Sequence, residues 1–440
     1  MFGRLGSSVE LPSTLLPREI SGLLFNSDGV LQTQAAESYF ATVHKMLPIV
    51  STRRFFQQIS SNTEHNTDVL LILLCMRLLT QHNEDTGALY EKAKQCFYYM
   101  EGRGVISFRM VQATLLLSLY EAANAIYPAA FMTIGHCARL GHAIGIHDRR
   151  NSPQMFPNAN SWTETEEICR TWWGVRVLDR YINMGVEKRP FTCEDAHPSD
   201  LLPMDESRWE LGEQTATPSL AVSGDTSLPA PPFSRTCQAT HLLSHVLSHL
   251  NTPQDSRNPQ DYYKSALQLH DILSSFHSAL SLELYNGGQD ISIEYASAMG
   301  ICLSACIALY ETHTCADLDY PEGVGTQEQL TVQQLALQRL QVMGQSACEF
   351  ASGLMTLQQQ FDGTLQSPFV TECLYAAAKQ FLWYIRETGK DELLAAVETL
   401  TSLLQVIGQK WHVASKFSFS ILTPITMILI NRCKMNTSKF

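Results

Sequence analysis

The chain has 440 residues, of which 45% are hydrophobic, so it is long enough for two or three average domains and can bury a large core. Its 31 lysine and arginine residues are outnumbered by 43 aspartate and glutamate residues, which gives a net charge of −12. Binding to nucleic acid through its phosphates needs a basic face, yet basic residues never form a run and cluster only in pairs such as Arg53-Arg54. We therefore expect no direct contact between this chain and nucleic acid.

The sequence also argues against secretion and membrane insertion. The N-terminus has no continuous apolar segment of the kind found in a signal peptide. The two most apolar stretches are residues 69–79, which contain Arg77, and residues 417–430, which contain Pro424. Both are shorter than the roughly 20 residues that span a bilayer. We expect them to be buried helices and expect no membrane partner.

Helical periodicity dominates the chain from residue 69 onward. Residues 111–123 and 129–146, separated by a break at Pro128, predict an antiparallel helix pair. Small residues along one side of the second helix, including Gly141 and Gly145, allow a neighbouring helix to approach closely. Strand signals are almost absent. The predicted fold class is all-α, a large multi-helix array or bundle with one long flexible insert, whose later helices lie around residues 330–357, 369–386 and 392–407.

Composition divides the chain into four parts. Residues 212–236 are rich in serine, threonine and proline without periodicity, which predicts a linker or long loop. Residues 1–30 form an N-terminal extension, residues 31–211 a first helical region, and residues 237–440 a C-terminal helical part of the same domain. A shorter break is expected around residues 317–327.

Three histidines have the spacing of a metal-binding helix. His241, His245 and His249 are four residues apart and share one helical face, but a catalytic metal site also needs a further ligand and an activated water. We interpret them as one polar face of a boundary helix.

Four further residues have a spacing compatible with metal binding, in an apolar segment. Buried free cysteines behave as small hydrophobic residues, so we interpret this segment as packed core. The four are Cys302, Cys306, His313 and Cys315.

No enzymatic motif is found. The sequence lacks GxSxG, HExxH, GxxxxGK[ST] and a GxGxxG following a strand. It also lacks adjacent aspartates, which would be needed to hold magnesium in a terpene-cyclase-like helix. We predict no catalytic residue, no metal ligand and no DNA-binding residue. An all-α small-molecule-binding protein or enzyme with an apolar pocket stays open as the alternative function.

The most informative stretch begins near Asn160. Thr163 and Glu166 fit a capping box that starts a helix. Two adjacent tryptophans point about 100° apart on this helix, so both can be buried only if the helix is enclosed. The adjacent Asp179 and Arg180 then need a hydrogen-bonded network. We expect the helix to run until Arg189-Pro190.

The order of these motifs resembles the middle homology region of fungal binuclear-zinc-cluster transcription factors. The resemblance covers most of the chain and is most specific between residues 131 and 203. Its motif residues, which we expect to have structural or regulatory roles, are Gly145, Ile146, His147, Arg170, Trp172, Trp173, Asp179, Arg180, Arg189, Pro190, Leu202 and Pro203.

The chain departs from the family pattern in two ways. Lys188 stands where the family usually has glycine before Arg-Pro. Residues 1–30 contain no six-cysteine cluster and no basic segment, although the family carries these parts N-terminal to the helical region. We therefore expect no cofactor in this chain, since zinc belongs to the missing N-terminal cluster.

The resemblance implies a nuclear fungal regulator of a metabolic or secondary-metabolite gene set. Without its own zinc cluster it would act as a homodimer or as a heterodimer with a zinc-cluster transcription factor, together with the transcription machinery and a small-molecule effector. We interpret Trp172, Trp173, Asp179 and Arg180 as a structural core in preference to a ligand site. Arg189 is the better candidate for contact with another helix or an effector.

Overall fold

The protein is all-α, as predicted from the sequence. Within the residues described here the chain forms helices and no strand, and extended pairing is limited to an isolated bridge between Leu201 and Ala221. Nearly all of the predicted extension 1–30, Cys315 and residues 424–430 of the second apolar stretch lie outside these residues. The computed structural model describes residues 22, 24, 33–61, 67–81, 86–155, 159–186, 188–214, 220–252, 258–285, 291–314, 327–360, 367–389 and 391–423.

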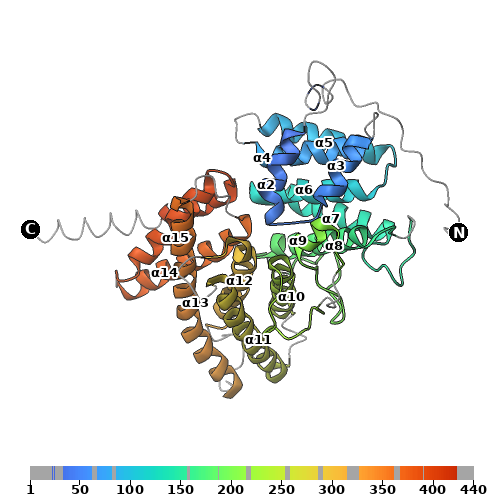
Figure 1. Ribbon diagram of the computed structural model, residues 1–440. Coiled ribbons are helices and arrows are strands. Elements are labelled where there is room, and N and C mark those ends of the chain that lie inside the picture. The colour runs from blue at the N-terminus through green and yellow to red at the C-terminus, as the bar shows by residue number, and fades with distance from the viewer. Residues whose placement is uncertain are drawn as a thin grey trace, which may run out of the picture.

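The N-terminal helices form one side of the molecule, coloured blue to cyan in Figure 1. α4 and α6 are apolar around nearly their whole circumference and lie in the core, where they pack against each other. α4 contains the predicted buried stretch 69–79. The helices of this side are α2 (Gln34–Ala41), α3 (Thr52–Ser61), α4 (Thr67–Thr80), α5 (Thr86–Gly102) and α6 (Phe108–Ala123).

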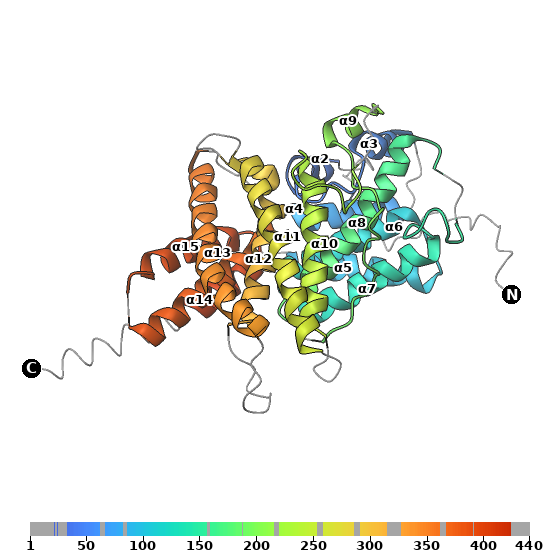
Figure 2. The ribbon, with the colours of Figure 1, turned by 90° about the horizontal axis from the view of Figure 1, so that it is seen from below.

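The remaining helices continue the array in chain order. Figures 1 and 2 both show the green and yellow helices in the middle and the orange and red helices on the side opposite the N-terminal group. A last helix covers residues 412–423. The others are α7 (Tyr127–Ile144), α8 (Trp162–Asn183), α9 (Glu206–Leu211), α10 (Pro232–Leu250), α11 (Pro259–Tyr285), α12 (Ala296–Thr312), α13 (Gln327–Gln360), α14 (Thr371–Thr388) and α15 (Leu394–Gly408).

The predicted helix pair is formed by α6 and α7, which pack against each other. Ser107 caps α6 by accepting a hydrogen bond from the backbone N–H of Met110. Pro128 lies in the first turn of α7, where its missing N–H leaves no intrahelical bond unmade. The break predicted at Pro128 is therefore the short turn between the two helices.

α12 is the most enclosed helix of the C-terminal half. It packs against α10, α11, α13 and α14. Among the residues described, the segment Ile293–Thr312 is the one helix long and apolar enough to cross a membrane, and 78% of its apolar window is buried inside the protein. This segment is not among the two most apolar stretches expected from the sequence to be buried helices. Its burial among four helices is that of a central core helix.

The predicted linker, residues 212–236, is described at 212–214 and 220–236. Its last five residues form the first turns of α10, which starts at Pro232. Before this helix the chain lies along the segment that follows α8, because Leu202 N–H donates to Leu220 O and Val222 N–H donates to Asp200 O. One continuous hydrophobic core extends from Leu24 to Ile421 and includes residues from both sides of this segment.

Candidate functional site

The start of α8 differs from the predicted capping box by two residues. Ser161, not Thr163, is the N-cap, and its Oγ accepts a hydrogen bond from the backbone N–H of Glu164. Glu164 Oε2 accepts the N–H of Asn160. Glu166 therefore does not cap the helix and instead accepts a hydrogen bond from Met204, outside α8, which the capping-box pattern did not indicate.

Arg170 is fully buried and connects α8 to the segment containing Leu202 and Pro203. Its Nε donates to Glu166 Oε1 at 2.9 Å and its Nη2 donates to Met204 O at 2.6 Å. Glu166 Oε1 also accepts the N–H of Met204, and the guanidinium lies 4.2 Å from the ring centre of Trp209. This motif arginine therefore holds the chain that leads into α9.

Asp179 and Arg180 form the buried network expected from the sequence. Asp179 is 0% exposed and accepts hydrogen bonds from Arg180, from the backbone and hydroxyl of Thr192, and from the N–H of Cys193. Arg180 is 1% exposed and donates to Cys193 O at 2.9 Å and to Asp195 Oδ1 at 2.7 Å. All of these partners except Arg180 itself lie in one segment, so the pair fastens residues 192–195 to α8.

α8 ends earlier than predicted, at Asn183, and Arg189 folds back onto this end. Arg189 Nε donates to Asn183 Oδ1 at 2.8 Å and Nη2 donates to Ile182 O at 2.6 Å, while the guanidinium lies 4.6 Å from the ring centre of Phe131 on α7. Burial lowers the pKa of Arg189. Pro190 follows and is exposed. Arg189 thus donates to one backbone carbonyl of the last helical turn, that of Ile182, which otherwise has no intrahelical partner.

Lys188 occupies the left-handed backbone conformation, which favours glycine, the residue that the family usually has at this position. Its φ is +57°, and its N–H donates to Asn251 Oδ1 at 2.8 Å. An L-residue with a side chain adopts this conformation at a cost of about 1–2 kcal/mol.

Gly145 ends α7 in the left-handed region. Its φ is +85°, and a Cβ there would lie 2.4 Å from Pro153 O. The backbone therefore requires glycine and turns sharply into the loop that carries His147. The His147 ring contacts both His142 and Trp172, and its Nε2 is 2.7 Å from Ser152 Oγ.

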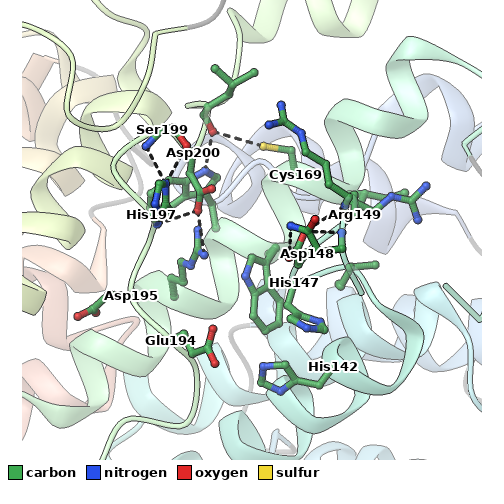
Figure 3. A pocket seen from close by; sticks show the side chains of 18 of the residues that line it. His142, His147, Asp148, Arg149, Cys169, Glu194, Asp195, His197, Ser199 and Asp200 are labelled. Atoms are coloured by element: carbon green, nitrogen blue, oxygen red, sulfur yellow. Dashed lines mark hydrogen bonds and ion pairs between the residues drawn. The ribbon is translucent and has the colours of Figure 1, made fainter. Parts of the chain in front are cut away.

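This turn opens a pocket of about 620 Å³. Its floor is α8, where Trp172 and Trp173 are 5% and 2% exposed. Figure 3 shows His147, Asp148 and Arg149 on one side and His197, Ser199 and Asp200 on the other. The lining residues are His142, Ile146, His147, Asp148, Arg149, Arg150, Asn151, Thr165, Ile168, Cys169, Trp172, Trp173, Arg176, Glu194, Asp195, His197, Ser199, Asp200 and Leu201.

The environment of the pocket suits binding better than nucleophilic chemistry. Burial raises the pKa of the Cys169 thiol to about 12, so it carries no thiolate at neutral pH. Burial, followed by the neighbouring His147, lowers the pKa of His142. Although burial opposes it, hydrogen bonds from Ser244 and Arg180 lower the pKa of Asp195. The imidazole of His142 is therefore neutral and the Asp195 carboxylate is ionised at pH 7.

Neither possible metal pattern converges among its members that the structure describes, which exclude Cys315. His241 and His245 face each other with Nε2 atoms 3.2 Å apart, whereas His249 lies 3.1 Å from His313 and stacks on Tyr262. Cys302 and Cys306 are buried in α12. Among the residues with described positions, no group of three metal-binding side chains converges.

A second buried charge cluster was not identified from the sequence. Glu167 is 0% exposed and accepts hydrogen bonds from Arg109 at 2.7 Å, from Gln112 at 3.2 Å and from the N–H of Ser51 at 3.1 Å. Its partners lie more than fifty residues away along the chain, so no local sequence pattern predicts them. The sequence feature that could have indicated a buried charge is the acidic pair Glu166-Glu167 on an otherwise enclosed helix.

The sequence pattern of the "Fungal specific transcription factor domain" matches residues 36–297, which is more than half of the chain and includes the whole of α8 and the pocket. The chain belongs to this family. The family and its relatives are transcription factors and not enzymes, so the chain is a transcriptional regulator. No solved structure matches the chain.

Curated relatives of this fungal regulator come from several species. Transcription factor BOA15 of Botryotinia fuckeliana is 34% identical over 163 residues, which cover 36% of this chain and 88% of that protein. Pigment biosynthesis transcriptional activator pigB of Monascus ruber is 30% identical over 40% of this chain and 34% of its own length. Azaphilone cluster-specific transcription factor azaR of Aspergillus niger is 24% identical over 62% of each chain. The regulator thus spans less than two thirds of pigB and azaR.

Proposed function

We propose that the chain regulates a secondary-metabolite gene set in the nucleus of a fungus. The observation that carries this proposal is the family match over residues 36–297. It is supported by relatives whose names refer to pigment biosynthesis, an azaphilone cluster and citrinin biosynthesis. We take residues 31–211 and 237–440 as two parts of one regulatory domain, joined through 212–236. The motif residues on α8 serve to fix the segments that surround the pocket.

The chain acts through a partner and does not contact DNA itself. The net charge is −12, and several of its cations are buried in internal ion pairs, where they cannot reach phosphates. Examples are Arg109 with Glu167, Arg170 with Glu166, and Arg235 with Glu283. We infer that it forms a homodimer or a heterodimer with a zinc-cluster transcription factor, and through it reaches the transcription machinery.

The regulatory role is tested by deleting the gene in its host and measuring transcripts across the genome. We expect a coordinated fall or rise in one contiguous set of biosynthetic genes, restored by the wild-type copy. A fluorescent fusion should accumulate in the nucleus. Unchanged transcripts under conditions in which the gene is expressed, or a fusion excluded from the nucleus, would contradict the proposal.

The partner role is tested by gel shift with promoter DNA from the affected genes. The purified chain alone should not shift the DNA, whereas adding a zinc-cluster protein recovered with it should give a complex larger than that protein gives alone. Tight, salt-sensitive binding by the chain alone would show a DNA-binding face on this chain and overturn this part of the proposal.

A further inference from the structure

The pocket above α8 has the size and floor of a small-molecule site. About 620 Å³ lies within the usual range for ligand pockets. Its apolar lining includes the indoles of Trp172 and Trp173 together with Ile146, Ile168 and Leu201. Both indoles belong to this lining although they are 5% and 2% exposed, and aromatic rings pack edge to face as well as stacked, so a planar ring system fits against them.

Arg176 places a positive charge in this pocket. Its side chain is only 9% exposed, lies 5.0 Å from the ring centre of Trp173, and pairs through Nη2 with Asp200 Oδ2 at 3.1 Å. Its Nε has no hydrogen-bond partner among the described atoms, and neither has Nε1 of Trp172. Buried donors are nearly always satisfied in native proteins, so these two N–H groups on pocket-lining residues are available to an acceptor, either a water or a ligand atom.

The charges around Arg176 favour an anion over a cation. The lining holds four carboxylates, and three of them are already engaged. Asp195 pairs with Arg180, Asp200 pairs with Arg176 itself, and Asp148 accepts the backbone N–H groups of Arg150 and Asn151 within its own turn. Two cations of the same wall, Arg149 and Arg150, form no ion pair with a described carboxylate; Arg149 donates to the neutral Gln154.

Glu194, the fourth carboxylate of the lining, lies away from Arg149 (Figure 3). Asp200 is 37% exposed and also accepts the N–H of His197 at 3.1 Å, so its carboxylate stays solvated and hydrogen-bonded when a ligand replaces it on Arg176.

We propose that this pocket binds a planar aromatic carboxylic acid, with its rings against the indoles of Trp172 and Trp173 and its carboxylate on the guanidinium of Arg176. The bound ligand contacts both the α7–α8 loop and residues 194–201. The motif residues hold these two segments beside α8. The claim that ligand binding controls gene regulation rests on the proposed function, whereas the claim that the ligand binds does not.

The test uses isothermal titration calorimetry on the purified full chain with three probes that share one ring system. These are 2-naphthoate, the neutral 2-naphthamide and the cationic 2-naphthylmethylammonium. We expect 2-naphthoate to bind at least about tenfold more tightly than the amide, because a hydrogen bond to a charged group adds this much, and the ammonium to bind least.

Two variants move the affinity in opposite directions. Arg176→Gln should weaken 2-naphthoate by roughly tenfold to a hundredfold and leave 2-naphthamide within about twofold. Asp200→Asn removes the competing carboxylate from a half-exposed position and should tighten 2-naphthoate by roughly tenfold. Arg386→Gln, at an exposed arginine on α14 paired with its neighbour Glu387, is the matched control and should change nothing.

Four results would overturn the proposal. They are no heat with 2-naphthoate up to about 1 mM, equal affinity for acid and amide, tighter binding of the ammonium, and no gain in Asp200→Asn. The last comparison keeps the test decisive if Arg176→Gln fails to fold. None of these results bears on transcript levels in the deletion strain, so failure here and failure of the proposed function are distinguishable.

Discussion

Gly141 of α7 lies directly against the indole of Trp172 of α8. A Cβ built on Gly141 would be 2.6 Å from Cζ3 of that ring, which is closer than real Cβ contacts. The ring is also in contact with His142 and His147. The absence of a side chain at residue 141 therefore sets how closely α7 approaches α8, and with it the position of the pocket floor.

We predict that Gly141→Ala destabilises the protein by about 1–3 kcal/mol, because an added methyl group in a packed contact forces the ring or the helix to shift. Gly135→Ala on the same helix is the control, since its Cβ would meet only Thr192 Cγ2 at 3.7 Å. It should stabilise by up to about 1 kcal/mol through helix propensity. Urea unfolding measures both changes, and equal effects would show that the contact with Trp172 is unimportant.

Asp179→Asn should lower the free energy of unfolding by about 3–5 kcal/mol. The change leaves the buried Arg180 without its adjacent charge and places an amide where Thr192 and Cys193 donate hydrogen bonds. Asp271→Asn, an exposed position on α11, should stay within about 0.5 kcal/mol of wild type. Thermal unfolding followed by circular dichroism tests this, and an unchanged melting temperature for Asp179→Asn would refute the buried network.

Lys188→Gly should stabilise the protein by about 1 kcal/mol, because glycine adopts a φ of +57° without steric strain. Lys188→Ala separates conformation from charge: it removes the ammonium but keeps a Cβ, so its stability should stay near wild type. Chemical denaturation of the three proteins gives the comparison. A gain in the alanine variant equal to that in the glycine variant would assign the effect to charge.

Glu372 on α14 should make stability depend on pH. Burial raises the pKa of this carboxyl to about 7, against an ordinary value of 4.5. The folded state therefore holds a proton that the unfolded chain releases, so the stabilisation is complete below pH 4.5 and is lost as pH rises to about 7.

The variant Glu372→Gln should remove about 1–3 kcal/mol of this pH-dependent change. Glu398→Gln, at an exposed position on α15, is the control and should leave the profile unchanged. Urea unfolding at several pH values between 4.5 and 7 measures it. A profile for Glu372→Gln that overlays the wild-type profile would show that the carboxyl is ionised in the folded state at pH 7.

Local sequence patterns predicted most of the helices but not all of their ends. The pair α6 and α7, the long α13 and the enclosed α8 follow from apolar periodicity, which is a property of neighbouring residues. The capping box predicts Thr163 as the N-cap of α8, whereas Ser161 is the N-cap, because several side chains in this turn are able to cap. The predicted C-terminal end at Arg189-Pro190 is too late, because Gly185 and Lys188 adopt positive φ values before Pro190.

The all-α class, the family and the burial of Trp172 and Trp173 can be predicted from the amino-acid sequence, because composition, motif order and helical spacing are read directly from the chain. The surroundings of these residues depend on how distant segments pack. The pocket is assembled from the loop after α7, one face of α8 and residues 194–201. Arg176 forms an ion pair with Asp200 in this pocket, and Glu167 forms one with Arg109 outside it. The partners of each pair are too far apart along the chain for a local sequence pattern to predict them. Their partners are chosen by packing, since a buried charge is tolerated only where the fold supplies its complement.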